Sequence, residues 1–141
     1  MTKIRIGIIG ATGYTGSELV RILHLHPLSD IQLITSESKS GQKFSDIHKA
    51  FTGYYDLELR KLAEIDNYEL DLVFLALPHG VSMGFVKENS NKNFKIIDLS
   101  GDFRLASAEI YKKWYGQDHI FTSAFANKVY GLPELYKEAI V

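Results

Sequence analysis

The chain has 141 residues, 45% of them hydrophobic and 23% charged, with a formal net charge of −1. These values are typical of one soluble globular domain with its own core, and the balanced charge excludes the basic surface that nucleic-acid binding requires. The chain has no cysteine, which excludes disulfides, thiolate metal sites and a cysteine nucleophile within these residues.

The N-terminus leads directly into a strand-like run, and no leader for secretion is visible. No apolar stretch approaches the length of a membrane span. We therefore expect a cytoplasmic protein with no membrane partner.

The first predicted unit is a strand, a glycine turn and a helix. Residues 3–9 are rich in β-branched side chains, as in a strand buried in a parallel sheet. An amphipathic helix follows and runs to about His26, where Pro27 marks the stop. Thr12 or Thr15 is the expected helix cap, and residues 15–18 fit a capping box.

The turn between them reads Gly10-Ala-Thr-Gly13-Tyr-Thr-Gly16, a variant of the dinucleotide-binding fingerprint. Three glycines at this spacing also occur in plain structural turns. Their place between strand and helix favours nucleotide binding, because the backbone can approach a pyrophosphate and helix N–H groups point at its charge. The candidate cofactor-binding residues here are Gly10, Thr12, Gly13, Tyr14, Thr15 and Gly16.

The loop after the second predicted strand, residues 31–36, should contact the adenosine ribose. Glu37 argues for the free 2′-hydroxyl of NAD, whereas Ser36, Ser38 and Lys39 together could donate to the 2′-phosphate of NADP. We favour NADP, because a phosphate needs several donors. Farther on, residues 44–52 are expected to hold a short helix, and residues 57–60 a short strand.

Two more buried strands are predicted at residues 71–77 and 95–99, with helices at 82–87 and 107–114. Ser107 is a plausible N-cap of the last helix and Gly116 its stop. Strands alternating with helices indicate a Rossmann-type α/β fold, a doubly wound and mostly parallel sheet with helices on both faces. Ligands bind beyond the carboxyl ends of such strands, which adds Leu77, Pro78, His79 and Ser100 to the candidate cofactor-binding residues.

Each of these polar residues also has a structural interpretation. Ser100 could cap a turn instead of contacting nicotinamide, and we interpret His79 as positional rather than as an acid or base. The other histidines lack ligand-spaced partners, so no metal is predicted. On the helix at 107–114, the aromatic side chains Tyr111 and Trp114, with the adjoining Tyr115, indicate a core or interface helix rather than a base-stacking platform.

Four blocks of the sequence resemble the N-acetyl-γ-glutamyl-phosphate reductases, and they occur in the order of that family. They are Gly10-Ala-Thr-Gly-Tyr-Thr-Gly-Ser-Glu-Leu19, Asp71-Leu-Val-Phe-Leu-Ala-Leu-Pro-His-Gly80, Ile97-Asp-Leu-Ser-Gly-Asp-Phe-Arg-Leu105 and Val129-Tyr-Gly-Leu-Pro-Glu-Leu135. The glycine block is common to many dehydrogenases. The three later blocks together are much more specific.

The resemblance implies NADPH-dependent reduction of an acyl phosphate to an aldehyde in arginine biosynthesis. In that family a cysteine forms a thioester, hydride from nicotinamide releases the aldehyde, and a histidine acts as acid and base. Both catalytic residues are expected after Val141, the cysteine in an Asn-Pro-Gly-Cys segment. Residues 1–141 then form the dinucleotide-binding domain, as an engineered fragment or a truncated product, and alone should bind NADP(H) without turnover.

The resemblance also suggests that Arg104 binds the phosphate of a small acyl-phosphate substrate. The alternative is an ion pair of Arg104 with Asp98 or Asp102. The tail from Phe121 is expected to expose apolar surface, and to be flexible or to pack on another copy in a homo-oligomer. Two other interpretations remain open: a stand-alone NADP(H)-binding sensor, and a fragment similar to aspartate-semialdehyde dehydrogenase.

Overall fold

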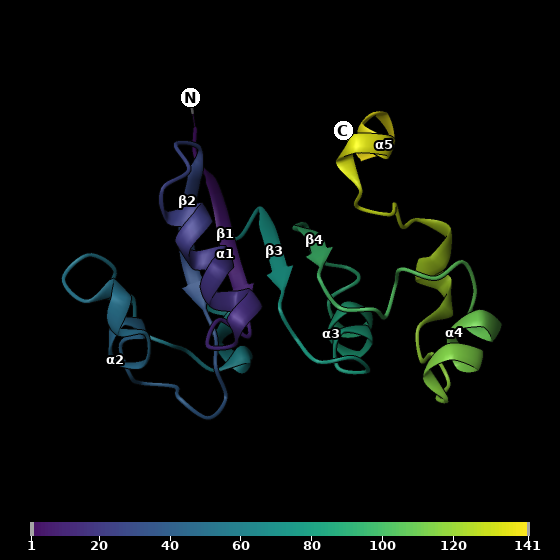
Figure 1. Ribbon diagram of the computed structural model, residues 1–141, viewed down its shortest axis with the longest axis horizontal. Coiled ribbons are helices and arrows are strands. Elements are labelled where there is room, and N and C mark those ends of the chain that lie inside the picture. Colours follow the sequence, from purple (N-terminus) through teal and green to yellow (C-terminus); the bar gives the residue numbers. More distant parts are fainter. Residues whose placement is uncertain (1, 141) are drawn as a thin grey trace. The chain divides into compact units, whose positions relative to one another are not determined.

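The computed structural model describes residues 2–140, which form two compact units (Figure 1). The first unit lies within residues 2–77 and 91–99. The second lies within residues 78–90 and 100–140.

A four-stranded parallel sheet forms the centre of the first unit. Its strands are β1 (Ile4–Ile9), β2 (Ser29–Ile34), β3 (Leu72–Leu75) and β4 (Lys95–Asp98), in the order β2-β1-β3-β4. This confirms the predicted parallel α/β fold. The chain leaves β1 toward β2 on one side and later adds β3 on the other, so the strand order reverses between β1 and β3. In doubly wound sheets the ligand crevice lies at such a reversal.

Helix α1 (Tyr14–His24) packs on β1 and β2 through an apolar stripe (Figure 1). Val20 is completely buried, and Leu19 and Leu23 pack around it. The buried core of this layer comprises Ile6, Ile8, Ala11, Val20, Ile34, Phe44, Phe51 and Leu59.

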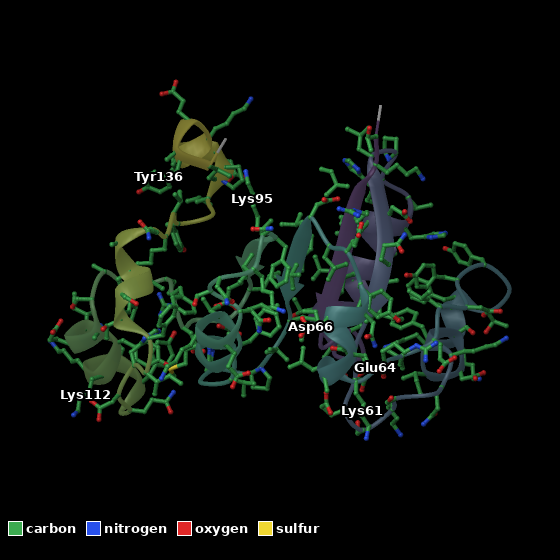
Figure 2. All side chains as sticks on the ribbon, turned by 180° about the vertical axis from the view of Figure 1, so that it is seen from behind. Lys61, Glu64, Asp66, Lys95, Lys112 and Tyr136 are labelled. Atoms are coloured by element: carbon green, nitrogen blue, oxygen red, sulfur yellow. The ribbon has the colours of Figure 1, made fainter. Side chains whose placement is uncertain are left out.

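The segment after β2 contains α2 (Phe44–Ile47) and two 3₁₀ helices, η1 (Lys49–Phe51) and η2 (Leu62–Asn67). The short helix predicted within residues 44–52 is therefore confirmed. At the start of η2 the Lys61 N–H donates to Glu64 Oε1 at 3.1 Å, and both residues are labelled in Figure 2.

The strand predicted at residues 57–60 is wrong. Only two isolated bridges form there, Thr35 with Arg60 and Lys43 with Glu58. The first bridge is parallel and the second is antiparallel, and they join this stretch to two different segments. The two bridges therefore cannot belong to one ladder. Burial of Leu59 explains the alternating pattern that suggested a strand. The strand predicted at 31–36 is present but begins earlier, at Ser29, because Ser29 pairs with Ile4.

The second unit contains α3 (Ser82–Glu88), α4 (Ala108–Tyr115), the 3₁₀ helix η3 (Thr122–Ala126) and α5 (Pro133–Ile140). The predicted ends of α4 are confirmed. Ser107 Oγ accepts the Ile110 N–H, and Gly116 ends the helix with φ of 71°. Left-handed φ at this position is easily adopted only by glycine.

Helix α4 presents a buried face and an open face. Tyr111 is completely buried, as predicted for a core helix, whereas Trp114 is 72% exposed, so a role for Trp114 at an interface stays a prediction. The two residues lie only about 60° apart around the helix axis, so the edge of the buried face passes between them.

The apolar surface predicted for the tail is present. Val129, Tyr130, Leu135 and Tyr136 are all exposed, and the rings of Tyr130 and Tyr136 lie 6.3 Å apart; Tyr136 is labelled in Figure 2. Within residues 2–140, none of the helices combines the length and the apolar character needed to cross a membrane.

Candidate dinucleotide-binding site

Two glycines allow the loop after β1 to pack closely against its neighbours. Gly10 has φ of +85°, and a Cβ there would lie 2.5 Å from the Ala76 carbonyl oxygen. A Cβ on Gly16 would lie 2.6 Å from Ala11 Cα and also overlap the Gly10 carbonyl oxygen. The loop therefore requires glycine at both positions to bring α1 against the sheet.

The loop is tied to the end of β2 by three hydrogen bonds. The Ala11 N–H donates to the Thr35 carbonyl at 2.9 Å, and the Gly10 N–H donates to Thr35 Oγ1 at 3.2 Å. Thr12 Oγ1 and Ser36 Oγ lie 3.1 Å apart. Two of the predicted ligand segments, the glycine loop and Ser36, are thus adjacent in the first unit.

The start of α1 has no side-chain cap among the described residues. Gly13 is the N-cap and carries no side chain, so the prediction of Thr12 or Thr15 as cap is wrong. Thr12 is engaged with Ser36, and Thr15 lies inside the first turn because Gly16 must already pack under Gly10.

This uncapped helix start is open to an anion. Its first turn carries no acidic side chain, and Gly13, Tyr14 and Thr15 are exposed, with Tyr14 at 97%. Unpaired N–H groups at a helix N-terminus point at a bound anion and carry a partial positive charge.

Glu37, which follows β2, is engaged elsewhere. Its Oε1 accepts the N–H of Leu62, the first residue of η2, at 2.9 Å. Ser36 is buried beside Thr12, whereas Ser38 and Lys39 are exposed. The acidic side chain at the end of β2 therefore caps a 3₁₀ helix, and the next two polar side chains face solvent.

Two predicted segments meet in the second unit. His79 Nδ1 accepts the Gly101 N–H at 2.9 Å, so a neutral His79 ring carries its proton on Nε2. The His79 ring lies 5.2 Å from that of Tyr115. A Cβ on Gly101 would overlap the Tyr115 hydroxyl and lie 2.9 Å from His79 Cε1, so a larger residue there would require these side chains to shift.

The buried carboxylate of Asp102 holds both segments. It accepts the N–H groups of Gly80 and Met83 at 2.9–3.1 Å and the hydroxyl of Tyr111 at 3.0 Å. Burial raises the pKa of Tyr111, Gln117 opposes this by donating to the hydroxyl, and Asp102 adds to the rise. A carboxylate with three donors is stable in the interior because its lone pairs are satisfied.

Arg104 contacts Tyr115 rather than Asp102. Its Nε donates to the Tyr115 hydroxyl at 3.0 Å, and the guanidinium lies 5.8 Å from the ring centroid. Asp102 is already engaged in the buried network, so the predicted alternative of an Arg104–Asp102 ion pair is wrong. Ser100 Oγ accepts the Asp102 N–H at 3.1 Å, which is the turn-capping role.

Two residues of these arrangements were missed by sequence reasoning. His48 Nε2 donates to the Thr12 carbonyl at 3.2 Å across 36 residues of chain, and Asp102 holds Gly80 across 22. No local pattern signals either contact. In the described part of the chain, no group of three or more His, Asp or Glu residues is placed to hold a metal ion.

Sequence comparison matches residues 5–141 to the family model described as semialdehyde dehydrogenase, NAD binding domain. N-acetyl-γ-glutamyl-phosphate reductases from Saccharophagus degradans and Halothermothrix orenii are 41% and 45% identical. Each alignment covers 97% of this chain and 40% of the relative. The reductase from Methanococcus maripaludis is 44% identical over 96% of this chain and 39% of its own length. The chain thus spans about two fifths of these curated relatives.

Solved structures share the fold. Aspartate semialdehyde dehydrogenase with NADP from Candida albicans has a TM-score of 0.63 at 20% identity, covering 76% of this chain and 32% of its own. The Vibrio cholerae aspartate semialdehyde dehydrogenase II complexed with ASA has a TM-score of 0.60 at 16% identity, covering 73% and 32%. Because the family model matches nearly all residues, this chain belongs to the semialdehyde dehydrogenase NAD-binding domain family.

Proposed function

We propose that this chain binds NADP(H) as the cofactor-binding part of an oxidoreductase that reduces N-acetyl-glutamyl 5-phosphate to N-acetyl-glutamate 5-semialdehyde in arginine biosynthesis. The names of relatives at 41–45% identity support the substrate. The cofactor supplies hydride when bound. The sequence has no cysteine, so the thiol that would form the thioester must come from outside these residues.

One observation carries the cofactor proposal: the uncapped start of α1 lies beside a glycine loop at the strand-order reversal. Gly10 and Gly16 leave no room for side chains, and the first turn of α1 offers its N–H groups without an acidic neighbour. These residues fit a pyrophosphate, because backbone donors and the helix dipole both favour negative charge there.

The position of Glu37 supports NADP over NAD. Its Oε1 accepts the Leu62 N–H, which directs this carboxylate toward η2, whereas NAD sites use the acidic residue at this place to accept from the ribose 2′-hydroxyl. Ser38 and Lys39 remain exposed as donors for a 2′-phosphate, with Ser36 beside them.

The residues that directly follow β3 and β4 remain proposed ligands. We assign Leu77, Pro78, His79 and Ser100 to the nicotinamide half of the cofactor and Arg104 to the phosphate of the substrate. In the second unit, Tyr115 occupies Nε of Arg104, so the terminal nitrogens of the guanidinium remain to bind a phosphate.

Titration of the chain with NADPH and NADH, followed by calorimetry, tests the cofactor proposal. We expect NADPH to bind at least about tenfold more tightly. The substitution Gly13→Asp separates binding from folding, because Asp is a good N-cap, yet its carboxylate would occupy the phosphate position. The nearest atom to a Cβ at Gly13 is 3.9 Å away.

We expect Gly13→Asp to keep or raise the melting temperature and to weaken NADPH binding by more than about tenfold. Unchanged NADPH affinity in Gly13→Asp would refute the site. Lys39→Ala should weaken NADPH and leave NADH unchanged, and equal effects on both would refute the 2′-phosphate assignment.

A further inference from the structure

His48 lies beneath the glycine loop without belonging to it. The residue follows α2, and its ring packs 4.7 Å from that of Phe44 and 6.5 Å from that of Phe51. Its Nε2–H points to the loop and donates to the Thr12 carbonyl at 3.2 Å. The aromatic neighbours hold the ring, so the direction of this hydrogen bond is determined by the core.

The bond to Thr12 controls where the next N–H points. All peptide bonds in the described residues are trans, and a trans peptide directs its C=O and N–H to opposite sides. With the Thr12 carbonyl turned toward His48, the Gly13 N–H is directed away from the ring. That N–H donates to the Gly10 carbonyl in a hydrogen bond of 3.5 Å, which is long enough to be replaced by a stronger bond to a phosphate oxygen.

The orientation of this peptide depends on hydrogen bonds to it. Gly13 has no side chain to restrict its backbone, so the Thr12–Gly13 peptide could rotate at low cost. Thr12 is held at two points, its hydroxyl by Ser36 and its carbonyl by His48. The hydroxyl contact fixes the side chain. Two hydrogen bonds orient the peptide plane, the His48 bond at 3.2 Å and the longer bond from the Gly13 N–H to the Gly10 carbonyl at 3.5 Å.

We propose that His48 is a positioning residue for pyrophosphate binding: its Nε2–H holds the Thr12–Gly13 peptide so that the Gly13 N–H faces a bound phosphate. This role rests on the proposed function, because it presumes that a dinucleotide occupies the glycine loop. His48 does not itself touch the ligand.

Two substitutions at one position separate the hydrogen bond from packing. His48→Phe keeps an aromatic ring and loses the donor, whereas His48→Gln retains a donor at the place of Nε2. The matched control is His24→Phe. His24 belongs to the same aromatic cluster, 5.4 Å from Tyr54 and 4.9 Å from Tyr55.

Two ligands separate binding of the pyrophosphate from binding of the adenosine 2′-phosphate. NADP⁺ carries the pyrophosphate, and adenosine 2′-monophosphate lacks it. We expect His48→Phe to weaken NADP⁺ about three- to tenfold, the range of one hydrogen bond, and to leave adenosine 2′-monophosphate unchanged. His48→Gln should bind both probes as the parent chain does, and so should His24→Phe. Equal weakening of both probes by His48→Phe, or no weakening of NADP⁺, would overturn the inference.

A measurement without ligand distinguishes this inference from the proposed function. In the unliganded chain, the amide resonance of Gly13 should move in His48→Phe and stay in place in His24→Phe. If the Gly13 resonance does not move in His48→Phe, His48 does not orient the Thr12–Gly13 peptide, and the inference is refuted. If that resonance moves but the parent chain binds no NADP⁺, His48 does orient the Thr12–Gly13 peptide. The proposed function then fails, and the role of His48 in pyrophosphate binding fails with it.

Discussion

Gly16 is a position in the loop that leaves no room for a side chain. A methyl group there would meet backbone atoms, Ala11 Cα at 2.6 Å and the Gly10 carbonyl oxygen, which cannot rotate away as a side chain can. Helix propensity alone would stabilise the variant, because Ala is more favourable than Gly in a helix by up to about 1 kcal/mol. The clash should outweigh that gain, since overpacking costs about 1–3 kcal/mol.

We therefore expect Gly16→Ala to lower the free energy of unfolding by about 1–2 kcal/mol, measured by urea denaturation. Gly13→Ala is the control, with its nearest atom at 3.9 Å. It should cost less than about 1 kcal/mol, the difference between Gly and Ala as an N-cap. Equal losses for the two variants would contradict the packing role of Gly16.

Asp71 and Arg5 form an exposed pair with a measurable titration. Arg5 donates to Asp71 through its side chain and through its backbone N–H, and these bonds lower the pKa of Asp71 from 3.8 to about 2. A carboxyl group whose pKa is lowered by folding stabilises the fold above its ordinary pKa, and that contribution is lost as pH falls from about 4 to about 2.

NMR titration of the Asp71 carboxyl should give a midpoint near 2. In Arg5→Gln we expect the midpoint to rise toward 3.8 without reaching it, because the backbone N–H remains. Arg21→Gln, which breaks the exposed pair with Glu18, should leave the Asp71 midpoint in place. A midpoint insensitive to Arg5→Gln would contradict the pairing.

Among the helices, α4 organises the second unit. Tyr111 donates to the buried carboxylate of Asp102, and Tyr115 accepts from Arg104 and contacts His79. The segments at Pro78–Gly80 and Ser100–Arg104 therefore share one support. A change inside α4 should be transmitted to both of them.

Tyr111→Phe removes one donor to Asp102 and the acceptor of the Gln117 amide. Leaving a buried charged group short of a partner costs about 1–3 kcal/mol, and we expect that loss in urea denaturation followed by the fluorescence of Trp114 on the same helix. Tyr115→Phe is the control, partly exposed, with a cost below about 1 kcal/mol. A larger loss from Tyr115→Phe than from Tyr111→Phe would refute the central place of Asp102.

Elements governed by neighbouring residues were predicted well. The Ser107 cap and the Gly116 stop of α4 depend on contacts within one turn, and both are present. The strand expected at 57–60 failed because its alternation reflects burial of Leu59 against the core. The cap of α1 failed because packing of Gly16 under Gly10 decides where that helix begins.

At the scale of the whole molecule, the exposed apolar side chains of the tail favour association. Leu135 is 71% exposed, and Val129, Tyr130 and Tyr136 are exposed near it in sequence. Clusters of exposed apolar side chains of this kind bind hydrophobic dyes and promote association.

We expect Leu135→Lys to lower the binding of the dye ANS to the folded chain while leaving its melting temperature unchanged, because an exposed side chain contributes little to the core. Leu25→Lys removes a similarly exposed leucine, at 67%, after α1. Dye binding should change less in that variant. Equal dye loss in the two variants would argue against a patch in the tail.

The sequence by itself determined the parallel α/β class, the glycine loop, the ends of α4 and the family, because periodicity and neighbouring residues carry that information. The roles of Glu37, His48 and Asp102 were decided only by tertiary structure. Their hydrogen bonds to Leu62, Thr12 and Gly80 cross 25, 36 and 22 residues. Such contacts depend on how the core brings distant segments together, and local propensity does not encode them.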